Sequence, residues 1–466
     1  MAFFYNRIML AQKPSIMYAF CERYSMAYGA TKVQVKFNSS RLTHFGGVYL
    51  FHLFLKQIGW RHLVGITIKY EQRNSQYTIP EQLFSLLYPV ILGLSRIEVS
   101  RLLGNNGVFK MLIGLNRFPD PTTLRRFLVR GSDELLPQLV RLHDRSRKYF
   151  IDRIVPEKKL LVDMDSTVCT LYGHQEGAMK GYNPRARGRR SYHPLFCFES
   201  NSGTSLLGLL RHGNAYTSTG AKEYLEQFFG QFPETEYAVR FRGDSGFYDK
   251  EIIALLSHKK AEFAIVADMT GPLKNLVTGL KYHVANGTDD RYSFAETTYQ
   301  PMKWERSYRY CIVRKKLASE ETDQTTLFTV DAYSYSAIVT TLAMTPANVW
   351  KFYSGRVQCE RDIRSLKEDY YLGNVPTQTF AANALYLEIL LWAYDLIKWF
   401  QRLCLPVRDH RKTLATLRQE LLLMPGSFAK HGSRQILRFP RNAPQQKTFW
   451  YAKKKIETLK DLNRVL

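Results

Sequence analysis

The sequence predicts an α/β protein with an α-helical N-terminal region, a core interrupted by a β-rich insertion, and a small C-terminal region. Helical spacing of apolar residues dominates the chain up to about residue 150. From Lys159 onward, strand-like alternation and β-branched residues appear, and strands then alternate with helices. A chain of 466 residues is long enough for several such regions around a sizeable core.

The composition indicates a polyanionic partner. Apolar residues make up 45% and charged residues 23%, which is ordinary for a globular protein, but 66 Lys and Arg stand against 41 Asp and Glu. A formal charge of +25 favours nucleic acid or an anionic membrane surface as the partner. The most apolar stretch, residues 384–400, contains Glu388, Asp395 and Lys398, so we expect no membrane-spanning helix and no membrane partner.

The cysteine pattern and the N-terminal residues indicate the cellular compartment of the protein. The six cysteines are scattered and form no CxxC pair, which disfavours a zinc site or a disulfide framework. Residues 1–13 lack the uninterrupted apolar run of a secretory signal. We expect a cytoplasmic, nucleoid-associated protein without a small-molecule cofactor.

Residues 1–150 are predicted to form a helical N-terminal DNA-binding domain. Helical patterns cover residues 49–59, 82–94 and 95–103. Pro121, with Asp120 or Thr122 as cap, predicts the start of a short helix.

That short helix has two interpretations. It carries Arg125, Arg126 and Arg130, and together with the preceding residues 97–112 it is typical of a helix-turn-helix that enters a DNA groove. The alternative is a structural helical bundle whose arginines are simply solvated.

Residues 155–268 are predicted to form the first part of the core. Its elements follow in the order three strands, helix, strand, helix, strand: residues 159–170, 195–199, 205–210, 221–232, 237–242, 250–257 and 261–266. This order matches a ribonuclease H-like fold, in which an antiparallel set of strands precedes parallel strands covered by helices.

Three further regions are predicted after the first part of the core. Residues 269–345 are rich in Tyr, Thr and Val and read as a β-rich insertion domain. Residues 346–403 form the second part of the core, with a long helix opening at Thr345 and another near residues 380–402. Residues 404–466 form a basic C-terminal region that ends in a short strand at 435–439 and a helix.

Four acidic residues lie on three different elements of this predicted core. Asp163 and Asp165 are two residues apart on a strand and share a face, Asp244 ends a later strand beside glycines, and Glu360 lies on a helix after the insertion. Converging oxygen ligands of this kind suit two divalent ions that activate water and stabilise a leaving oxygen at phosphorus. Each residue alone could equally be a capping or ion-paired carboxylate.

A second pattern surrounds Glu360. Tyr353, Arg356, Glu360 and Lys367 follow at offsets of 0, 3, 7 and 14, which places them on one stripe of a continuous helix. A carboxylate flanked by a phenol and two cations can hold a metal ion together with a phosphodiester. The alternative is an ordinary charged helix face with i,i+4 ion pairs.

These motifs resemble the DDE transposases of bacterial insertion sequences. Asp165-Ser-Thr167 resembles the first-aspartate pattern D-x-T, and Asp244-Ser-Gly-Phe247 resembles the second-aspartate pattern D-x-G-F. The spacing Y-(2)-R-(3)-E-(6)-K is similar to the signature of the insertion-sequence 4-like supergroup. Further runs resemble its branch named insertion sequence family 1380: residues 173–177, 181–183, 210–214 and 381–386.

The resemblance implies the chemistry and the ligands. Asp165, Asp244 and Glu360 would form the catalytic, metal-binding triad, with Asp163 as the alternative first ligand. Two Mg²⁺ ions, or Mn²⁺ as a substitute, would serve as cofactors. The protein would act as an endonuclease and strand transferase on double-stranded DNA, both transposon ends and target, as a homodimer in the DNA complex.

The resemblance also implies DNA contacts. Tyr353, Arg356 and Lys367 would bind phosphates of the transposon end. Trp304 would stack on a flipped base, or else be a buried strand tryptophan. Arg187, Arg189 and Arg190, in the loop 185–190, are expected to bind phosphate; the alternative is a solvated loop.

Two rival functions stay open at this point. One is a ribonuclease H-like DNA nuclease without strand transfer. The other is a non-catalytic, DNA-binding descendant of a transposase.

Overall fold

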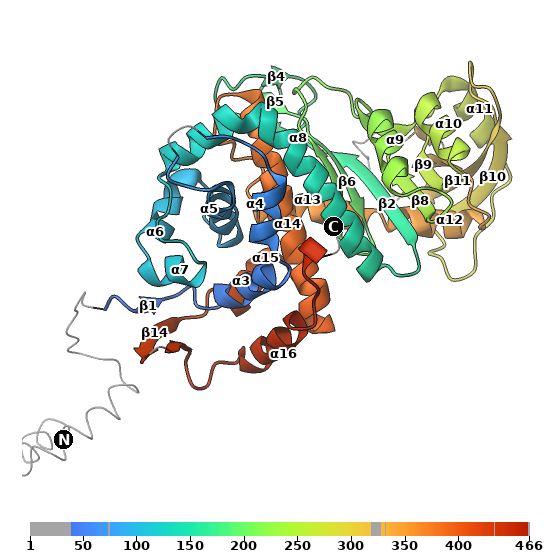
Figure 1. Cartoon of the computed structure of the whole chain (residues 1–466). Helices are drawn as coiled ribbons and strands as arrows, with labels where there is room; N and C mark the ends of the chain where they lie inside the picture. Colours follow the sequence, from blue (N-terminus) through green and yellow to red (C-terminus); the bar gives the residue numbers. More distant parts are fainter. Residues whose placement is uncertain (1–38, 73–74, 318–327, 331, 433, 465–466) are drawn as a thin grey trace, which may run out of the picture. The chain divides into compact units, whose positions relative to one another are not determined.

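The largest sheet of the described structure is mixed and has nine strands; most of them are labelled in Figure 1. The computed structural model describes residues 39–72, 75–317, 328–330, 332–432 and 434–464. The strand order is β10-β11-β13-β9-β8-β2-β6-β7, with β12 paired to β13. The strands are β2 (Lys159–Ser166), β6 (Leu195–Glu199), β7 (Thr204–Leu209), β8 (Ala238–Gly243), β9 (Glu262–Val266), β10 (Tyr292–Tyr299), β11 (Tyr308–Lys316), β12 (Phe328–Val330) and β13 (Tyr333–Thr340).

The first five core strands follow the predicted element order. β2 pairs antiparallel with β6, and β6 antiparallel with β7, whereas β8 pairs parallel with both β2 and β9. The helices α9 (Ala221–Gln231) and α10 (Lys250–His258) connect β7 to β8 and β8 to β9, as the periodicity predicted. Because β2 and β8 are parallel, their carboxyl ends lie at the same edge of the sheet.

The β-rich segment 269–345 extends this same sheet. β13 pairs antiparallel with β9, so that Ile338 lies opposite Val266, and β11 and β10 follow outward. Alternation along β11 buries Tyr310 and Ile312 on one side and Cys311 and Val313 on the other. The segment also contains the helix α11 (Gly271–Thr278). The segment is thus β-rich as predicted, and its strands are continuous with those of the core.

The helix that begins at Pro121 is much longer than predicted. It starts where expected, because Asp120 caps it by accepting a hydrogen bond from the Thr122 N–H at 2.9 Å. As α8 (Pro121–Ile154) it then continues for 34 residues through Pro137. The prediction of a short helix was therefore wrong: buried apolar residues recur at helical spacing from Leu124 to Ile151 and carry the helix past the predicted boundary at residue 150.

α8 packs along α14 (Phe380–Cys404), the central helix of the fold. Within the described residues, α14 is the one helix with the length and mean hydropathy (1.3) of a membrane span, but 83% of that window is buried inside the protein. One hydrophobic core includes residues of α8, α14, the smaller N-terminal helices and the C-terminal helix. The N-terminal helical region and the C-terminal region therefore share a core.

The remaining elements flank this core. The N-terminal ones are β1 (Leu42–Thr43), α3 (Val48–Gln57), α4 (Trp60–Thr67), α5 (Ile79–Ile91), the 3-10 helix η2 (Ile97–Ser100), α6 (Arg101–Gly104) and α7 (Gly107–Leu112). The C-terminal ones are η4 (Val407–Asp409), α15 (Leu414–Leu417), the π-helical turn η5 (Arg418–Leu422), β14 (Gly426–His431), β15 (Arg434–Arg438), α16 (Gln446–Ile456) and η6 (Leu462–Arg464). β15 and α16 confirm the predicted final strand and helix, and β14 joins β1 and β15 in a small sheet.

A buried polar network connects α8, α14 and β7. His143 Nδ1 lies 2.6 Å from Glu388 Oε1, and its Nε2 lies 3.0 Å from Asp395 Oδ2. Arg147 Nε also donates to Asp395 at 3.2 Å, while Ser205 of β7 donates to it from both N and Oγ at 2.7 Å. Burial raises the pKa of Glu388 to about 8 and lowers that of His143, so this network contains fewer charges than its composition suggests.

Removal of Asp395 should destabilise the protein strongly. Asp395→Ala leaves Arg147 buried without its innermost carboxylate, which should lower the free energy of unfolding by about 3–5 kcal/mol. Urea denaturation followed by circular dichroism measures this loss. Asp144→Ala is the control: Asp144 pairs with the same Arg147 at 2.8 Å from a side chain that is 24% exposed, and its loss should cost about 1 kcal/mol. Equal losses in the two variants would contradict the assignment.

Candidate active site

Asp163 of β2 is engaged in a buried ion pair. Arg242 of β8, its register partner, donates to the two Asp163 carboxylate oxygens from Nε and Nη2, each at 2.6 Å. The Ser200 hydroxyl donates to the same carboxylate. A bidentate pair of this kind is strong and directional, so the alternative first ligand predicted from the sequence is occupied by a structural partner.

Arg242 also binds the helix that follows the β-rich segment 269–345. Its Nη1 donates to the carbonyl oxygen of Phe352 at 2.7 Å, near the end of α12 (Pro346–Ser354). A Cβ atom at Gly355 would lie 2.5 Å from this Nη1. Gly355 is therefore required by the close approach of a guanidinium that Asp163 holds in place.

The long helix predicted from Thr345 is broken. α12 ends at Ser354, and α13 (Val357–Glu368) begins after Gly355 and Arg356. The prediction of one continuous helical stripe was wrong for this reason, and Tyr353 lies on a different helix from Glu360 and Lys367. The break places Arg356 at the N-cap position of α13.

Arg356 lies among the three predicted catalytic carboxylates. Its Nη2 is 3.0 Å from Asp165 Oδ1 and 3.5 Å from Asp244 Oδ2, and its Nη1 is 3.9 Å from Glu360 Oε1. Asp165 comes from the end of β2, Asp244 from the end of β8, and Glu360 from the first turn of α13. Elements far apart in the sequence thus bring the three carboxylates to one cation.

Backbone contacts orient two of these carboxylates. Asp165 Oδ1 accepts a hydrogen bond from the Ser166 N–H at 2.8 Å. Asp244 Oδ1 accepts one from the Gly246 N–H at 3.0 Å and caps the 3-10 helix η3 (Ser245–Phe247). Exposure of the side chains rises from 16% at Asp165 to 38% at Asp244 and 56% at Glu360, so the cluster opens to solvent on the Glu360 side.

The electrostatics of the cluster follow from this burial. Burial raises the pKa of Asp165 to about 6, opposed by the charge of Arg356 and assisted by Asp244. Burial alone would lower the pKa of Arg356, but the charges of Asp165 and Asp244 together have the larger effect and raise this pKa. Arg356 therefore stays charged and compensates a group of carboxylates that would otherwise repel one another.

The donor set suits a divalent cation. Within the described ranges, no group of three His, Cys, Asp or Glu side chains is arranged to hold one metal ion, and Arg356 lies among the carboxylates. Their oxygens are the ligands that Mg²⁺ and Mn²⁺ prefer. The Nε of Arg356 is buried without a hydrogen-bond partner among the described residues, which is unfavourable unless a ligand supplies an acceptor.

The other signature residues lie close to this cluster. Burial raises the pKa of Tyr353, with smaller effects from Arg356 and Asp244, and its ring stacks on Trp350 at 6.2 Å. Burial, aided by the charge of Arg185, lowers the pKa of Lys367. Glu368, the acidic residue next to Lys367 and outside the signature spacing, is exposed and, within the described part of the chain, forms no ion pair with Arg356, unlike Glu360.

Trp304 lies in the turn between β10 and β11, outside both strands, and is half-buried. Its ring contacts Tyr248 at 5.1 Å and Tyr308 at 5.6 Å. It borders a cavity of about 380 Å³ that Lys250, His258 and Arg306 also line. Tyr248, which contacts the Trp304 ring, directly follows η3, the 3-10 helix that Asp244 caps.

The predicted arginines differ in their surroundings. Arg125 is bound within the chain, because it pairs with Glu98 and its Nε donates to the Pro376 carbonyl oxygen at 3.0 Å. Arg126 is exposed. Arg187 and Arg189, between β4 (Met179–Lys180) and β5 (Arg190–Tyr192), and Arg190, the first residue of β5, are exposed as well.

Sequence reasoning missed two groups beside the cluster. The Ser166 hydroxyl lies 3.0 Å from His193 Nε2, and His193 Nδ1 donates to the Ala215 carbonyl oxygen at 2.9 Å, which leaves Nε2 to accept from Ser166. Asp268 follows β9, and burial, together with the charge of Asp244, raises its pKa. An acidic residue directly after a third parallel strand was a usable signal for Asp268, whereas nothing in the sequence signals His193.

Comparison with known proteins identifies the family of this chain. The family model described as "Transposase DDE domain group 1" matches residues 26–461, so the chain belongs to this family of DDE transposases. No curated protein matches the chain. Among solved structures, a piggyBac transposase synaptic complex with hairpin DNA matches with a TM-score of 0.43 and 11% sequence identity, covering 81% of this chain and 80% of that one.

The raised pKa of Asp165 predicts a pH-dependent stability. Because the pKa is about 6 in the folded protein against an ordinary 3.8, the folded state binds this proton more tightly. The associated stability is complete below about pH 4 and lost as the pH rises through 6. In EDTA at pH 7, Asp165→Asn should therefore be about 2–3 kcal/mol more stable than the unmodified protein, and equally stable near pH 4. Urea denaturation at both pH values tests this, and a less stable variant at pH 7 would contradict it.

A methyl group at Gly355 should disturb the site. Gly355→Ala forces the Arg242 guanidinium away from Asp163 or moves α13, and should cost about 1–3 kcal/mol of unfolding free energy. Thermal or urea denaturation measures the loss. Gly373→Ala is the matched control, since a Cβ there meets nothing within 4 Å. The assignment fails if both variants are equally stable.

Proposed function

We propose that this transposase binds the terminal inverted repeats of a bacterial insertion sequence, cleaves DNA at their ends and transfers the resulting strands to target DNA. The observation that carries the proposal is the convergence of Asp165, Asp244 and Glu360 on one cation at the solvent-exposed edge of the sheet. The chain's family membership supports the same reading. The four-residue signature around Glu360 favours the insertion-sequence 4-like supergroup and its family 1380.

We assign a ribonuclease H-like core to this protein. The strand order β7-β6-β2-β8-β9, numbered along the chain, is 3-2-1-4-5, with the first three strands antiparallel and the last two parallel to the first. Asp165 and Asp244 leave the two central strands at one edge, where ligands bind in open α/β sheets. The β-rich segment 269–345 is then an insertion between the last core strand and the helix that carries Glu360.

In this proposal Asp165, Asp244 and Glu360 would hold two Mg²⁺ ions. When bound, the ions supply an activated water and charge stabilisation at phosphorus. Hydrolysis forms a bond from the water oxygen to phosphorus and breaks the bond to the 3′-oxygen, which takes a proton and leaves as a 3′-hydroxyl. In strand transfer that hydroxyl attacks a target phosphodiester, and the target's 3′-oxygen leaves.

The residues around the acidic cluster would contact the DNA in different ways. Arg356 is the counter-ion of the three carboxylates in the free protein, and its unpaired Nε–H is a donor for a phosphate oxygen in the complex. Lys367 and the phenol of Tyr353 bind neighbouring phosphates. Trp304, beside its cavity, is available to stack on an unpaired base.

Exposed arginines extend this contact with DNA. Arg126, Arg187, Arg189 and Arg190 have the exposure that phosphate contacts require. The protein acts in the cytoplasm at the nucleoid, as a homodimer that pairs two transposon ends.

Cleavage of end DNA tests the function. Purified protein with Mg²⁺ and duplexes from the DNA that flanks the gene should produce nicks with 3′-hydroxyl ends, and EDTA should abolish them. Glu360→Gln should slow nicking by at least about 10²-fold, since it removes one ligand of the metal site. Glu368→Gln, an exposed neighbour on the same helix, should nick at the normal rate.

Two outcomes would contradict this proposal. Full nicking by Glu360→Gln would remove Glu360 from the catalytic site. Nicking without any joined product, when target DNA and a pre-cleaved end are supplied, would indicate a nuclease without strand transfer.

A further inference from the structure

The C-terminal β14–β15 hairpin and α16 have an unusual charge pattern. Residues 421–456 contain no Asp or Glu. They contain eight basic residues: Lys430, Arg434, Arg438, Arg441, Lys447, Lys453, Lys454 and Lys455. The charge excess of the whole protein is therefore locally concentrated in this element.

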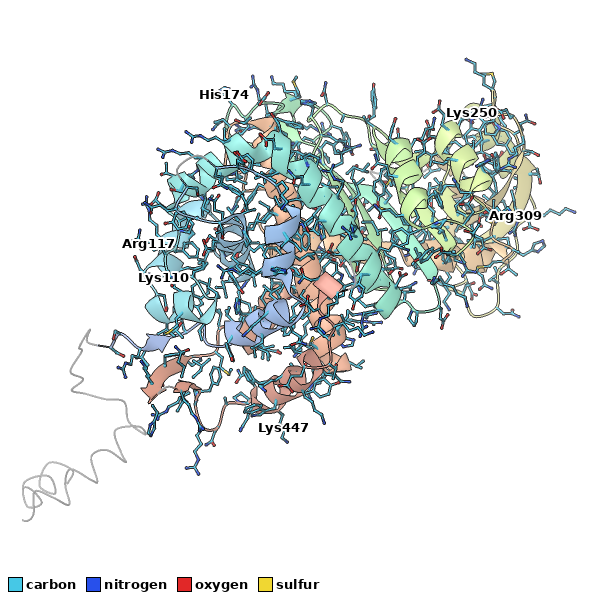
Figure 2. The ribbon with its side chains drawn as sticks, viewed as in Figure 1. Lys110, Arg117, His174, Lys250, Arg309 and Lys447 are labelled. Atoms are coloured by element: carbon cyan, nitrogen blue, oxygen red, sulfur yellow. The ribbon has the colours of Figure 1, made fainter. Side chains whose placement is uncertain are left out.

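α16 presents a basic and aromatic stripe to solvent. Its buried residues Phe449, Ala452 and Ile456 pack into the protein core. The opposite face carries Lys447, Trp450, Tyr451 and Lys454, at positions i, i+3, i+4 and i+7. Trp450 is 57% exposed and Tyr451 43% exposed, although large aromatic side chains of this kind normally contribute to a core or an interface. Figure 2 shows Lys447 on α16 at the outer edge of the ribbon.

The hairpin and α16 together form one surface. Between them lies a cavity of about 540 Å³. This cavity is lined by Leu437, Phe439 and Phe449 and bordered by Arg441, Trp450 and Lys453. Lys430, Arg434 and Arg438 are exposed on the hairpin. Lys453 pairs with Glu457 at 2.6 Å. Among the described residues, no acidic side chain pairs with Arg434, Arg438, Arg441, Lys447 or Lys454, so these charges are available to an external anion.

We propose that this surface binds the phosphate backbone of double-stranded DNA, at a place separate from the acidic cluster. Its lysines and arginines would pair with phosphates, and Trp450 and Tyr451 would stack on sugars or exposed bases. Backbone contacts of this kind position DNA without reading its sequence. The partner class rests on the proposed function, whereas the surface itself rests on the charge pattern and exposure of these residues.

Other partners fit this surface less well. In a two-fold dimer the same patch would meet itself, and eight cations without an acidic residue would repel their copies. A membrane-surface helix inserts its apolar face into lipid, but the apolar face of α16 is already buried against the core. Duplex DNA satisfies the cations and leaves this packing intact.

Removal of two charges from the stripe tests the proposal. Lys447→Gln/Lys454→Gln in the full-length protein should weaken binding to a random-sequence 40-base-pair duplex about tenfold at 0.1 M KCl and reduce the salt slope by about 2. Fluorescence anisotropy across a KCl series, with EDTA present, measures both. The matched control, Lys260→Gln/Lys281→Gln, removes the same charge from exposed positions elsewhere and should change the affinity less than twofold. Trp450→Ala, which leaves the charge unchanged, should also weaken binding.

Several outcomes would overturn the proposal. Equal weakening in the two double variants would show that the loss of affinity depends only on net charge. An unchanged affinity would show that this surface does not bind DNA. Binding of the stripe to anionic vesicles but not to duplex would assign it to a membrane, and loss of a dimer in light scattering would assign it to a second copy. Because binding is measured in EDTA, a failure here is distinguishable from failure of the nicking experiment.

Discussion

The structure of the site depends on the buried ion pair between Asp163 and Arg242. This pair joins the central parallel strands β2 and β8, and the third nitrogen of the same guanidinium binds the end of α12 at Phe352. The strands that deliver Asp165 and Asp244 are thereby fixed to each other and to α12, the helix that precedes the one carrying Glu360. Desolvation makes such a pair costly to assemble, and removal of one partner leaves an uncompensated buried charge. We infer that its main contribution is to position the site.

The carboxylates of the acidic cluster lie close enough together to repel one another. Burial and mutual repulsion raise the pKa of Asp165, and Arg356 relieves part of that repulsion in the free protein. A site of this kind is less stable than a neutral one, a frequent cost of catalytic preorganisation. Arg356 also has a buried Nε–H without a hydrogen-bond partner among the described residues, which a phosphate oxygen would satisfy under the proposed function. The basic C-terminal surface would then hold DNA at a distance from the chemistry.

The sequence predicted those features that depend on local pattern. Alternation placed Asp165 on a strand and Asp244 after one, and the element order indicated that both would lie at one edge of the sheet. Features that depend on long-range contacts were missed. The break before α13 lies where Arg242, distant in sequence, approaches Gly355, and the pairing of β13 with β9 joins residues far apart in the chain. The length of α8 was missed because its buried residues face α14, a partner more than 200 positions away. The ion pair of Asp163 was missed because the sequence shows only that Asp163 and Asp165 share a face of their strand. It does not show which residues of neighbouring strands each side chain contacts.

Metal-directed cleavage of the polypeptide tests the central claim most directly, namely that Asp165, Asp244 and Glu360 form one metal site. Fe²⁺ bound in place of Mg²⁺, with ascorbate and peroxide, releases radicals that cut the backbone next to the ion. The account predicts cuts near residues 165, 244 and 360 of the same protein, all suppressed by excess Mg²⁺. Cuts confined to one of these segments, or found only elsewhere in the chain, would contradict it.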